Sequence, residues 1–403
     1  MARMPQLGRA VSTTIGLAIL ILGTTYGGME LWPRVEAYRT MQELDRRWHD
    51  ASLPPSARNQ AAQLLAEYGP DAEPYLLAAA HDGEGRVREA AYGYLAGLVP
   101  VPEEAVAICL AAVKDEETPR SRAVAARSLG TIAFMIRHTR SERRGAIITA
   151  LTTAGRDDSP VVRRAAVRAM VEASAVSVDP SPWLEDSDPL VRYAAAEAIY
   201  WLDPQNRGRM IPTLRALIVA ADPARPGDVW RPFGLLLRAD RLAGQPLVPT
   251  FVGWLRHEDP RVSHQAIGWL QLLGPLARDA VPALESLLDG KNPSLRAHAA
   301  MAIIAIHPAG CDRAAACLLT LLRNTNFPPQ RRIEALIPLG RVVTDAAVPP
   351  KVRDAALQII RAVPEEPGIH PEFSRRVRMF LEYQERIRAS MTATSAVRPA
   401  ELQ

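Results

Sequence analysis

The chain has 403 residues, of which 48% are hydrophobic and only 5% are aromatic, and its formal net charge at pH 7 is +4. This length exceeds one ordinary domain, and many alanines with few aromatics suit packed helices. The net charge is mild, although the basic residues are nearly all arginine: the lysines are Lys114, Lys291 and Lys351. We interpret this arginine bias as a habit of the source genome, with selection for anion or phosphate binding as the alternative.

A hydrophobic segment lies close to the N-terminus. Residues 10–29 contain no charged residue and are about as long as a bilayer-spanning helix, with Arg3 and Arg9 before them and Glu30 after them. We predict a tail at 1–9 and a transmembrane signal anchor at 10–29. The alternative is a cleaved signal peptide, because the apolar centre at 15–22 is short, but no Ala-x-Ala site follows it.

The charges around this segment give conflicting signals about its orientation. Arg3 and Arg9 favour a cytoplasmic N-terminus, whereas four arginines between 34 and 47 favour the reverse. We expect a single-pass membrane protein with the rest of the chain on the extracytoplasmic side, because so short an N-terminal tail is typical of a signal anchor. Gly23 and Gly27 have a spacing that could pair two membrane helices, which is a weak indication of a homodimer.

Residues 30–50 are predicted to form a membrane-proximal amphipathic helix. One apolar stripe recurs every three or four residues at Val35, Tyr38, Met41, Leu44 and Trp48. The simpler interpretation is a cap over the first repeat. The alternative is a helix for the membrane surface or for self-association.

The phrase Asp188-Pro189-Leu190-Val191-Arg192-Tyr193-Ala194-Ala195 recurs in close copies along most of the chain. Asp188 can cap a helix, and Pro189 suits the first helical position, so each copy starts a helix. Steps such as 34 residues from Arg88 to Arg122 and 29 from Arg163 to Arg192 predict a repeat of two short helices. In these copies an arginine is followed three residues later by a small residue, and the copy at Ser263 lacks the arginine. We assign a structural role to the following repeat arginines: Arg88, Arg122, Arg163, Arg192, Arg231, Arg296, Arg332 and Arg353.

These copies resemble the HEAT-repeat family, including its short HEAT-like branch, in which Asp-Pro-x-Val-Arg-x-x-Ala opens the second helix of each pair. The resemblance covers 51–365 and implies an all-α fold, an α-solenoid of stacked antiparallel helix pairs. In one unit, 281–288 is expected to be helix A, 291–293 the turn and 294–306 helix B. Irregular units are expected before Asp188, where little remains of a helix A, and between Arg332 and Arg353.

The repeated arginine could in principle follow the phosphates of a nucleic acid. The family resemblance implies instead that it pairs with turn carboxylates, such as Asp158, Asp188 and Asp228, and with neighbouring carbonyl groups. We therefore expect a structural role and regard nucleic acid as an improbable ligand.

Five of the seven tryptophans fall in the middle repeats: Trp183, Trp201, Trp230, Trp254 and Trp269. Aromatic and arginine side chains together are typical of interface hot spots, although Ala-rich repeats also use aromatics to fill their cores. If these residues do bind a partner protein, the candidates are Tyr193, Trp201, Trp230, His264 and Trp269.

The sequence has no phosphate loop, dinucleotide fingerprint, zinc-protease motif or nucleophile elbow. A single His257-Glu258 pair cannot hold the two irons of the HEAT-like hydroxylases, and the spacing of His307, Cys311, Asp312 and Cys317 fits no standard zinc module. We predict no enzyme activity, no cofactor and no metal. A HEAT-like lyase activity survives only as a family-level analogy.

The C-terminal part is expected to close the stack. A linker near 364–368 precedes an amphipathic capping helix within 366–390, and 391–403 is polar and expected to be disordered. The sequence thus favours a membrane-tethered scaffold that binds partner proteins, with a nucleic-acid- or polyanion-binding solenoid as the alternative.

Overall fold

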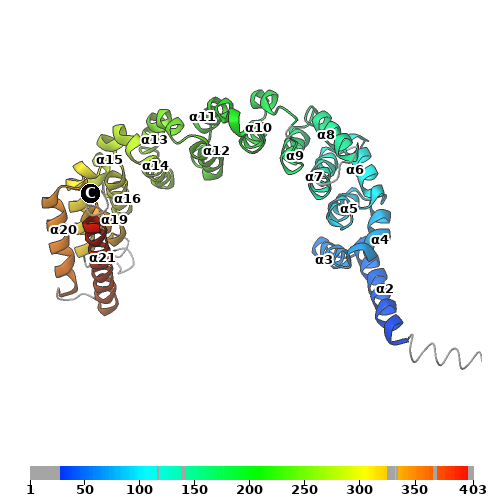
Figure 1. The fold of residues 1–403 in the computed structure, drawn as a ribbon, viewed down its shortest axis with the longest axis horizontal. Coiled ribbons are helices and arrows are strands. Elements are labelled where there is room, and N and C mark those ends of the chain that lie inside the picture. The colour runs from blue at the N-terminus through cyan, green and yellow to red at the C-terminus, as the bar shows by residue number, and fades with distance from the viewer. Residues whose placement is uncertain are drawn as a thin grey trace, which may run out of the picture. The chain divides into compact units, whose positions relative to one another are not determined.

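The computed structural model describes residues 28–115, 118–137, 142–175, 177–324, 332, 335–365 and 370–397. All of its regular elements over these residues are helical. The contacts divide the chain into two compact units, residues 1–205 and 206–403. The expected all-α solenoid of paired helices is confirmed within each unit (Figure 1).

In the first unit, the second helix of each pair forms one layer, here called the B layer. In chain order it holds α3 (Pro55–Ala66), α5 (Gly85–Gly97), α7 (Pro119–Met135), α9 (Pro160–Glu172) and α10 (Pro189–Leu202) (Figure 1). The last four pack against one another in this order, and α3 is joined to the start of α5 by the Arg58–Glu84 ion pair. The opposite layer holds the short 3₁₀ turn η2 (Gly69–Ala72) and the first helices of the pairs, α4 (Glu73–Ala79), α6 (Glu103–Asp115) and α8 (Glu142–Ala154).

The start of α10 shows why the repeated phrase begins a helix. The Asp188 carboxylate accepts hydrogen bonds from the backbone N–H groups of Leu190 at 2.8 Å and Val191 at 3.1 Å. Pro189 occupies the first turn, where an N–H group would have no partner within the helix. The apolar face that follows is fully buried: Val191, Ala195 and Ile199 each have 0% exposure.

The expected irregular unit before Asp188 is present. In place of a first helix there is only the 3₁₀ turn η3 (Ser181–Glu185). The Trp183 indole in this turn is buried, and its Nε1 donates to the Gly155 carbonyl oxygen at 2.5 Å. Gly155 has no room for a side chain, because a Cβ atom there would lie 2.5 Å from the Trp183 ring.

The second unit repeats the pairing. It begins within η4 (Pro204–Met210). Its next elements are α11 (Ile211–Val219), α12 (Pro226–Ala239), η5 (Leu242–Leu247), α13 (Val248–Trp254), α14 (Pro260–Leu273), η6 (Gly274–Ala280), α15 (Val281–Leu288), α16 (Pro293–Ile306), η7 (Pro308–Gly310) and α17 (Asp312–Arg323). The expected pair at 281–288 and 294–306 is confirmed as α15 and α16. After it come α19 (Leu336–Thr344), α20 (Pro350–Ala362), η8 (Val363–Glu365) and α21 (Pro371–Val397).

The ends of the chain differ in part from the sequence prediction. Helix α2 (Gly28–His49) packs on α3 with Met41, Leu44 and Trp48 buried, which supports the cap interpretation, but Tyr38 is 54% exposed. Helix α21 buries Phe373 and Val377, and it continues to Val397 where a disordered tail was expected from 391. The tail at 1–9, residues 10–27 of the expected membrane segment and 398–403 lie outside the described residues. Among the helices of the described part, none has the length and apolar character to cross a bilayer.

Close helix packing in the first unit depends on Gly130. A Cβ atom there would lie 2.8 Å from the backbone Cα of Ala169, on the neighbouring helix α9, and 3.0 Å from a carboxylate oxygen of Glu172. We expect Gly130→Ala to destabilise the chain by about 1–3 kcal/mol, because backbone atoms cannot move aside as a flexible side chain can.

The matched control is Gly93→Ala in α5, where a Cβ atom would meet nothing within 4 Å. This change should stabilise the chain by about 0.5–1 kcal/mol through helix propensity. Thermal unfolding of both full-length variants tests the comparison, and equal shifts in melting temperature would contradict it.

Candidate functional site

The repeated arginines of the first unit bind the turn that precedes their own helix. The Arg163 Nη1 donates to the carbonyl oxygens of Asp157 and Asp158, both at 2.9 Å. Arg192 donates in the same way to the carbonyls of Asp186 at 2.7 Å and Ser187 at 3.0 Å. Arg88 repeats the pattern with the carbonyls of Asp82 and Gly83, at 2.8 and 3.2 Å.

Some of the repeated arginines also reach the turn of the next repeat. Arg163 makes a bidentate pair with the Asp186 carboxylate, with both N···O distances 2.7 Å. Arg122 makes the equivalent pair with Asp157, at 2.8 and 3.0 Å. We call these repeated contacts, together with Arg58–Glu84 at 2.7 Å, the arginine ladder. Two parallel hydrogen bonds to one carboxylate fix orientation as well as charge.

The carboxylates of the ladder differ from those that the sequence suggested. Asp158 contributes only its carbonyl, Asp188 caps α10, and Asp228 is an exposed residue in the first turn of α12. The carboxylate partner stands three residues before the helix-starting proline, as Asp157 does before Pro160 and Asp186 before Pro189. Backbone N–H groups two residues further on hold these carboxylates in place, from Ser159 and Asp188, both at 2.8 Å. This Asp-x-x-Pro spacing was visible in the sequence.

The four remaining repeat arginines, all in the second unit, have other surroundings. Arg231 is exposed and Arg353 is half-buried. Arg332 is buried, donates to the Leu322 carbonyl at 2.7 Å and stacks 4.1 Å from the centre of the Phe373 ring. The Nε of Arg296 is buried and has no hydrogen-bond partner among the described residues.

The ladder changes the ionisation of its carboxylates. The hydrogen bonds from Arg163 lower the pKa of Asp186, aided by the Asp188 N–H and the charges of Arg163 and Arg192 and opposed by burial. Burial alone would raise the pKa of Asp157, but the Arg122 hydrogen bonds, the Ser159 N–H and the nearby guanidinium charges outweigh it and lower that pKa.

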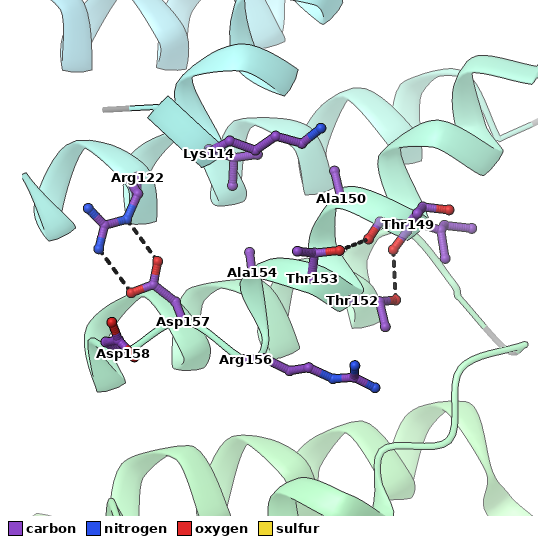
Figure 2. Close-up of a pocket in the computed structure, with 12 residues that line it drawn as sticks. Lys114, Arg122, Thr149, Ala150, Thr152, Thr153, Ala154, Arg156, Asp157 and Asp158 are labelled. Atoms are coloured by element: carbon purple, nitrogen blue, oxygen red, sulfur yellow. Dashed lines mark hydrogen bonds and ion pairs between the residues drawn. The ribbon is translucent and has the colours of Figure 1, made fainter. Parts of the chain in front are cut away.

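A hollow of about 600 Å³ adjoins the Arg122–Asp157 pair (Figure 2). The threonine hydroxyls that line it donate to carbonyl groups of their own helix, as Thr153 does to Thr149 at 3.1 Å and Thr152 to Ile148 at 2.8 Å. The lining cations Lys114 and Arg156 are exposed. This hollow therefore borders the ladder, and its hydroxyl groups are occupied by the helix itself.

Two further hollows lie on the B layer of the first unit and share Arg127. One, of about 450 Å³, is lined by α3, α5 and α7, and the other, of about 400 Å³, by α7, α9 and α10. We call the two together the B-layer groove. Its charged side chains are Arg58, Glu84, Arg86, Glu89, Arg120, Arg127, Arg164, Arg168, Glu172 and Glu197.

Three of the arginines in the B-layer groove are already paired. Arg58 binds Glu84, Arg120 binds Glu89 at 2.9 Å, and Arg168 binds Glu197 at 3.3 Å. Partial burial raises the pKa of Glu172, and the charges of Arg168 and Arg127 oppose this rise.

Two of the partner-binding candidates from the sequence lie at or beside this groove. Trp201 lines it and is 61% exposed. The Tyr193 hydroxyl donates to Glu197 at 3.0 Å, so Tyr193 supports the Arg168–Glu197 pair from one helical turn away. Both residues belong to α10.

The other candidates lie in the second unit. Trp269 is fully buried, at the centre of an aromatic cluster with Phe251 at 5.3 Å, Trp254 at 5.4 Å and Trp230 at 5.9 Å between ring centres. Its side chain is therefore core and has no surface for a partner, which corrects the sequence hypothesis. Trp230 is 43% exposed. Both ring nitrogens of His264 have hydrogen-bond partners: Nδ1 lies 2.7 Å from the Pro260 carbonyl oxygen, and Nε2 lies 3.0 Å from the Ser294 hydroxyl.

Within the described part of the chain, no three His, Cys, Asp or Glu side chains come together in a way that could hold a metal ion. The family profile for HEAT repeats matches residues 248–340. The comparison with curated proteins found no match.

Solved structures with a similar fold include nuclear import receptors. The Kap95–Nup1 complex has a TM-score of 0.57 at 15% identity, covering 95% of this chain and 55% of that one. Kap95p with RanGDP has a TM-score of 0.55 at 12% identity, covering 86% of this chain and 51% of that one. Importin beta has a TM-score of 0.53 at 15% identity, covering 83% and 50%. The chain thus spans about half the length of these proteins, and the similarity is one of fold.

The ladder makes the stability of the folded chain depend on pH. Because the folded pKa of Asp186 is lowered, its stabilising effect is complete above the unfolded value of about 3.9 and is lost as the pH falls through the folded value. We expect Asp186→Asn to cost about 2 kcal/mol at pH 7. The difference in melting temperature between this variant and the original chain should shrink toward zero in acid.

Asp158→Asn is the control, because the ladder uses only the Asp158 carbonyl, which the substitution keeps. Its melting temperature should follow that of the original chain at every pH. A gap for Asp186→Asn that stays constant from neutral pH into acid would show that the ionised pair does not provide the stabilisation.

Proposed function

Because this chain is an α-solenoid of HEAT-like repeats, we propose that it is a non-catalytic scaffold that binds a partner protein through the B-layer groove of its first unit. The observation that carries the proposal is the exposed Trp201 ring beside a row of arginines and glutamates. Protein interfaces concentrate binding energy in Trp, Tyr and Arg. Trp201 lines the same hollow as the 45%-exposed Val161, so the groove presents an apolar patch next to its charged side chains.

Two features support a protein as the partner. The groove presents hydrogen-bond donors, acceptors and an apolar ring within one surface, which fits the mixed chemistry of a polypeptide. Two of the similar solved structures contain partner proteins, Nup1 and RanGDP, although that information concerns those receptors.

We also propose that residues 10–29 hold this scaffold in a membrane, with the repeats on the extracytoplasmic side. The support is the uncharged run of residues itself and the positive charges of Arg3 and Arg9 before it. Helix α2 begins at Gly28, at the end of this run, and packs on the first repeat. A tether so close to the solenoid would keep the first unit near the bilayer.

The polyanion alternative has weaker support. Several of the repeated arginines bind carbonyl groups and carboxylates of the ladder, so they are not available as a row of phosphate-binding groups. The glutamates of the groove would repel phosphates.

Trp201→Ala should remove partner binding without loss of stability, because the ring is mostly in solvent. We expect partners captured from solubilised membranes by the full-length protein to fall by about tenfold or more, as for a hot-spot residue. Quantitative mass spectrometry of the captured proteins measures this change.

The matched control is Tyr383→Ala on α21 in the second unit, where the side chain is equally exposed at 60%. Its captured set should equal that of the original chain. The proposal fails if Trp201→Ala retains every partner at its original level.

The membrane proposal has its own test. A reporter that is active only outside the cytoplasm, fused after Gln403, should be active, and the fusion should stay with the membranes after a carbonate wash. Deletion of residues 1–29 should release the protein from the membranes. An inactive reporter on a well-expressed fusion would overturn the orientation, and release of the intact chain by carbonate would overturn the anchor.

A further inference from the structure

We infer that the B-layer groove of the first unit binds an extended acidic segment of its partner protein. This inference rests on the proposed function and specifies the chemistry of the partner. It is carried by the charge that remains in the groove after its internal ion pairs are formed.

The remaining charge is positive. The groove is lined by six arginines and four glutamates. Arg58, Arg120 and Arg168 are occupied by glutamates of the groove, whereas Arg86, Arg127 and Arg164 make no ion pair with any described residue. These three belong to α5, α7 and α9, so successive helices of the B layer each present one available guanidinium group. A guanidinium group binds a carboxylate in a bidentate, directional way.

The position of Arg127 links the two hollows. It lines both of them, and its charge opposes the effect of burial, which raises the pKa of the Glu172 carboxylate. A ligand carboxylate at Arg127 would therefore lie on a path that continues in both directions, toward Arg86 and toward Arg164. This arrangement suits an elongated ligand.

The groove glutamates distinguish a peptide from a nucleic acid. Glu172 lies among Arg127, Arg164 and Arg168 in the second hollow. An unbroken row of phosphates would have to pass this carboxylate, which costs free energy by like-charge repulsion. A peptide can place a neutral residue or a backbone N–H at that point and still place carboxylates at the arginines.

The dimensions indicate the length of the segment. Packed helices lie about 8–10 Å apart, so four steps from α3 to α10 span roughly 36 Å. At about 3.3 Å per residue, an extended segment of about 11 residues covers this distance. Trp201 and the 45%-exposed Val161 lie at the α9–α10 end. The segment is therefore expected to carry an aromatic or aliphatic residue near that end.

The test uses labelled synthetic peptides of about 12 residues and fluorescence anisotropy with the full-length protein. One peptide alternates glutamate with glycine or serine and ends in phenylalanine. In its matched control every glutamate is replaced by glutamine. We expect the glutamate peptide to bind at least about tenfold more tightly at physiological salt, since charge-assisted hydrogen bonds are roughly twice as strong as neutral ones.

The variant Arg127→Glu/Arg164→Glu should lose this preference. Arg156→Glu is the control for the charge reversal itself, because Arg156 is an exposed arginine without an ion pair to any described residue and lies outside the groove. It should bind the glutamate peptide as the original chain does. Unchanged melting temperatures for both variants establish that the groove alone is altered.

Three outcomes would overturn the inference: equal binding of the glutamate and glutamine peptides, equal losses for the two variants, or a single-stranded RNA of similar length that binds more tightly than the peptide through Arg127 and Arg164. If the peptides fail while Trp201→Ala still loses its captured partners, the acidic-segment inference is wrong and the scaffold proposal stands. If the peptide binds through the arginines while Trp201→Ala retains all partners, the scaffold proposal in its present form is wrong.

Discussion

The first unit depends on a guanidinium group that joins two turns. Arg163 holds the carbonyl groups of its own turn and the Asp186 carboxylate of the next one, so a single side chain sets the spacing of consecutive repeats. A repeat protein has no central core, and the interface between neighbours must supply its cohesion. The ladder supplies the directional part of that interface, and buried alanines with Gly130 supply the close helix contact.

The arginines of this unit therefore divide into two groups with different roles. Those of the ladder point into the turns and are saturated by carbonyl and carboxylate oxygens. Arg86, Arg127 and Arg164 belong to α5, α7 and α9 and line the B-layer groove. The count of basic residues in the sequence combines both groups, which is why composition alone left anion binding open as an alternative to a compositional habit of the source genome.

The fold could be predicted from the sequence because one repeated motif specifies a helix cap, a first turn and a buried face. In Asp188-Pro189 the cap and the first turn of α10 are decided by two residues, and the apolar spacing after them specifies the buried face. The site was less predictable. Exposure of an aromatic side chain depends on its helix face and on neighbours distant in sequence, so Trp201 and Trp269 looked alike although one is 61% and the other 0% exposed. The groove arginines are not marked by a sequence motif, because the groove is formed by side chains of several helices that are distant in sequence.

Each of the two units is stabilised internally by a different kind of contact. Among the described residues, the ladder occurs in the first unit, whereas the second relies on the aromatic cluster around Trp269 and on buried aliphatic side chains. Ionic contacts weaken in acid and high salt, while apolar contacts weaken on cooling. Hydrogen exchange should therefore show two regions of amide protection. The first unit should open before the second in acid or high salt, and the order should reverse on cooling, so the stability of each unit responds to a different condition.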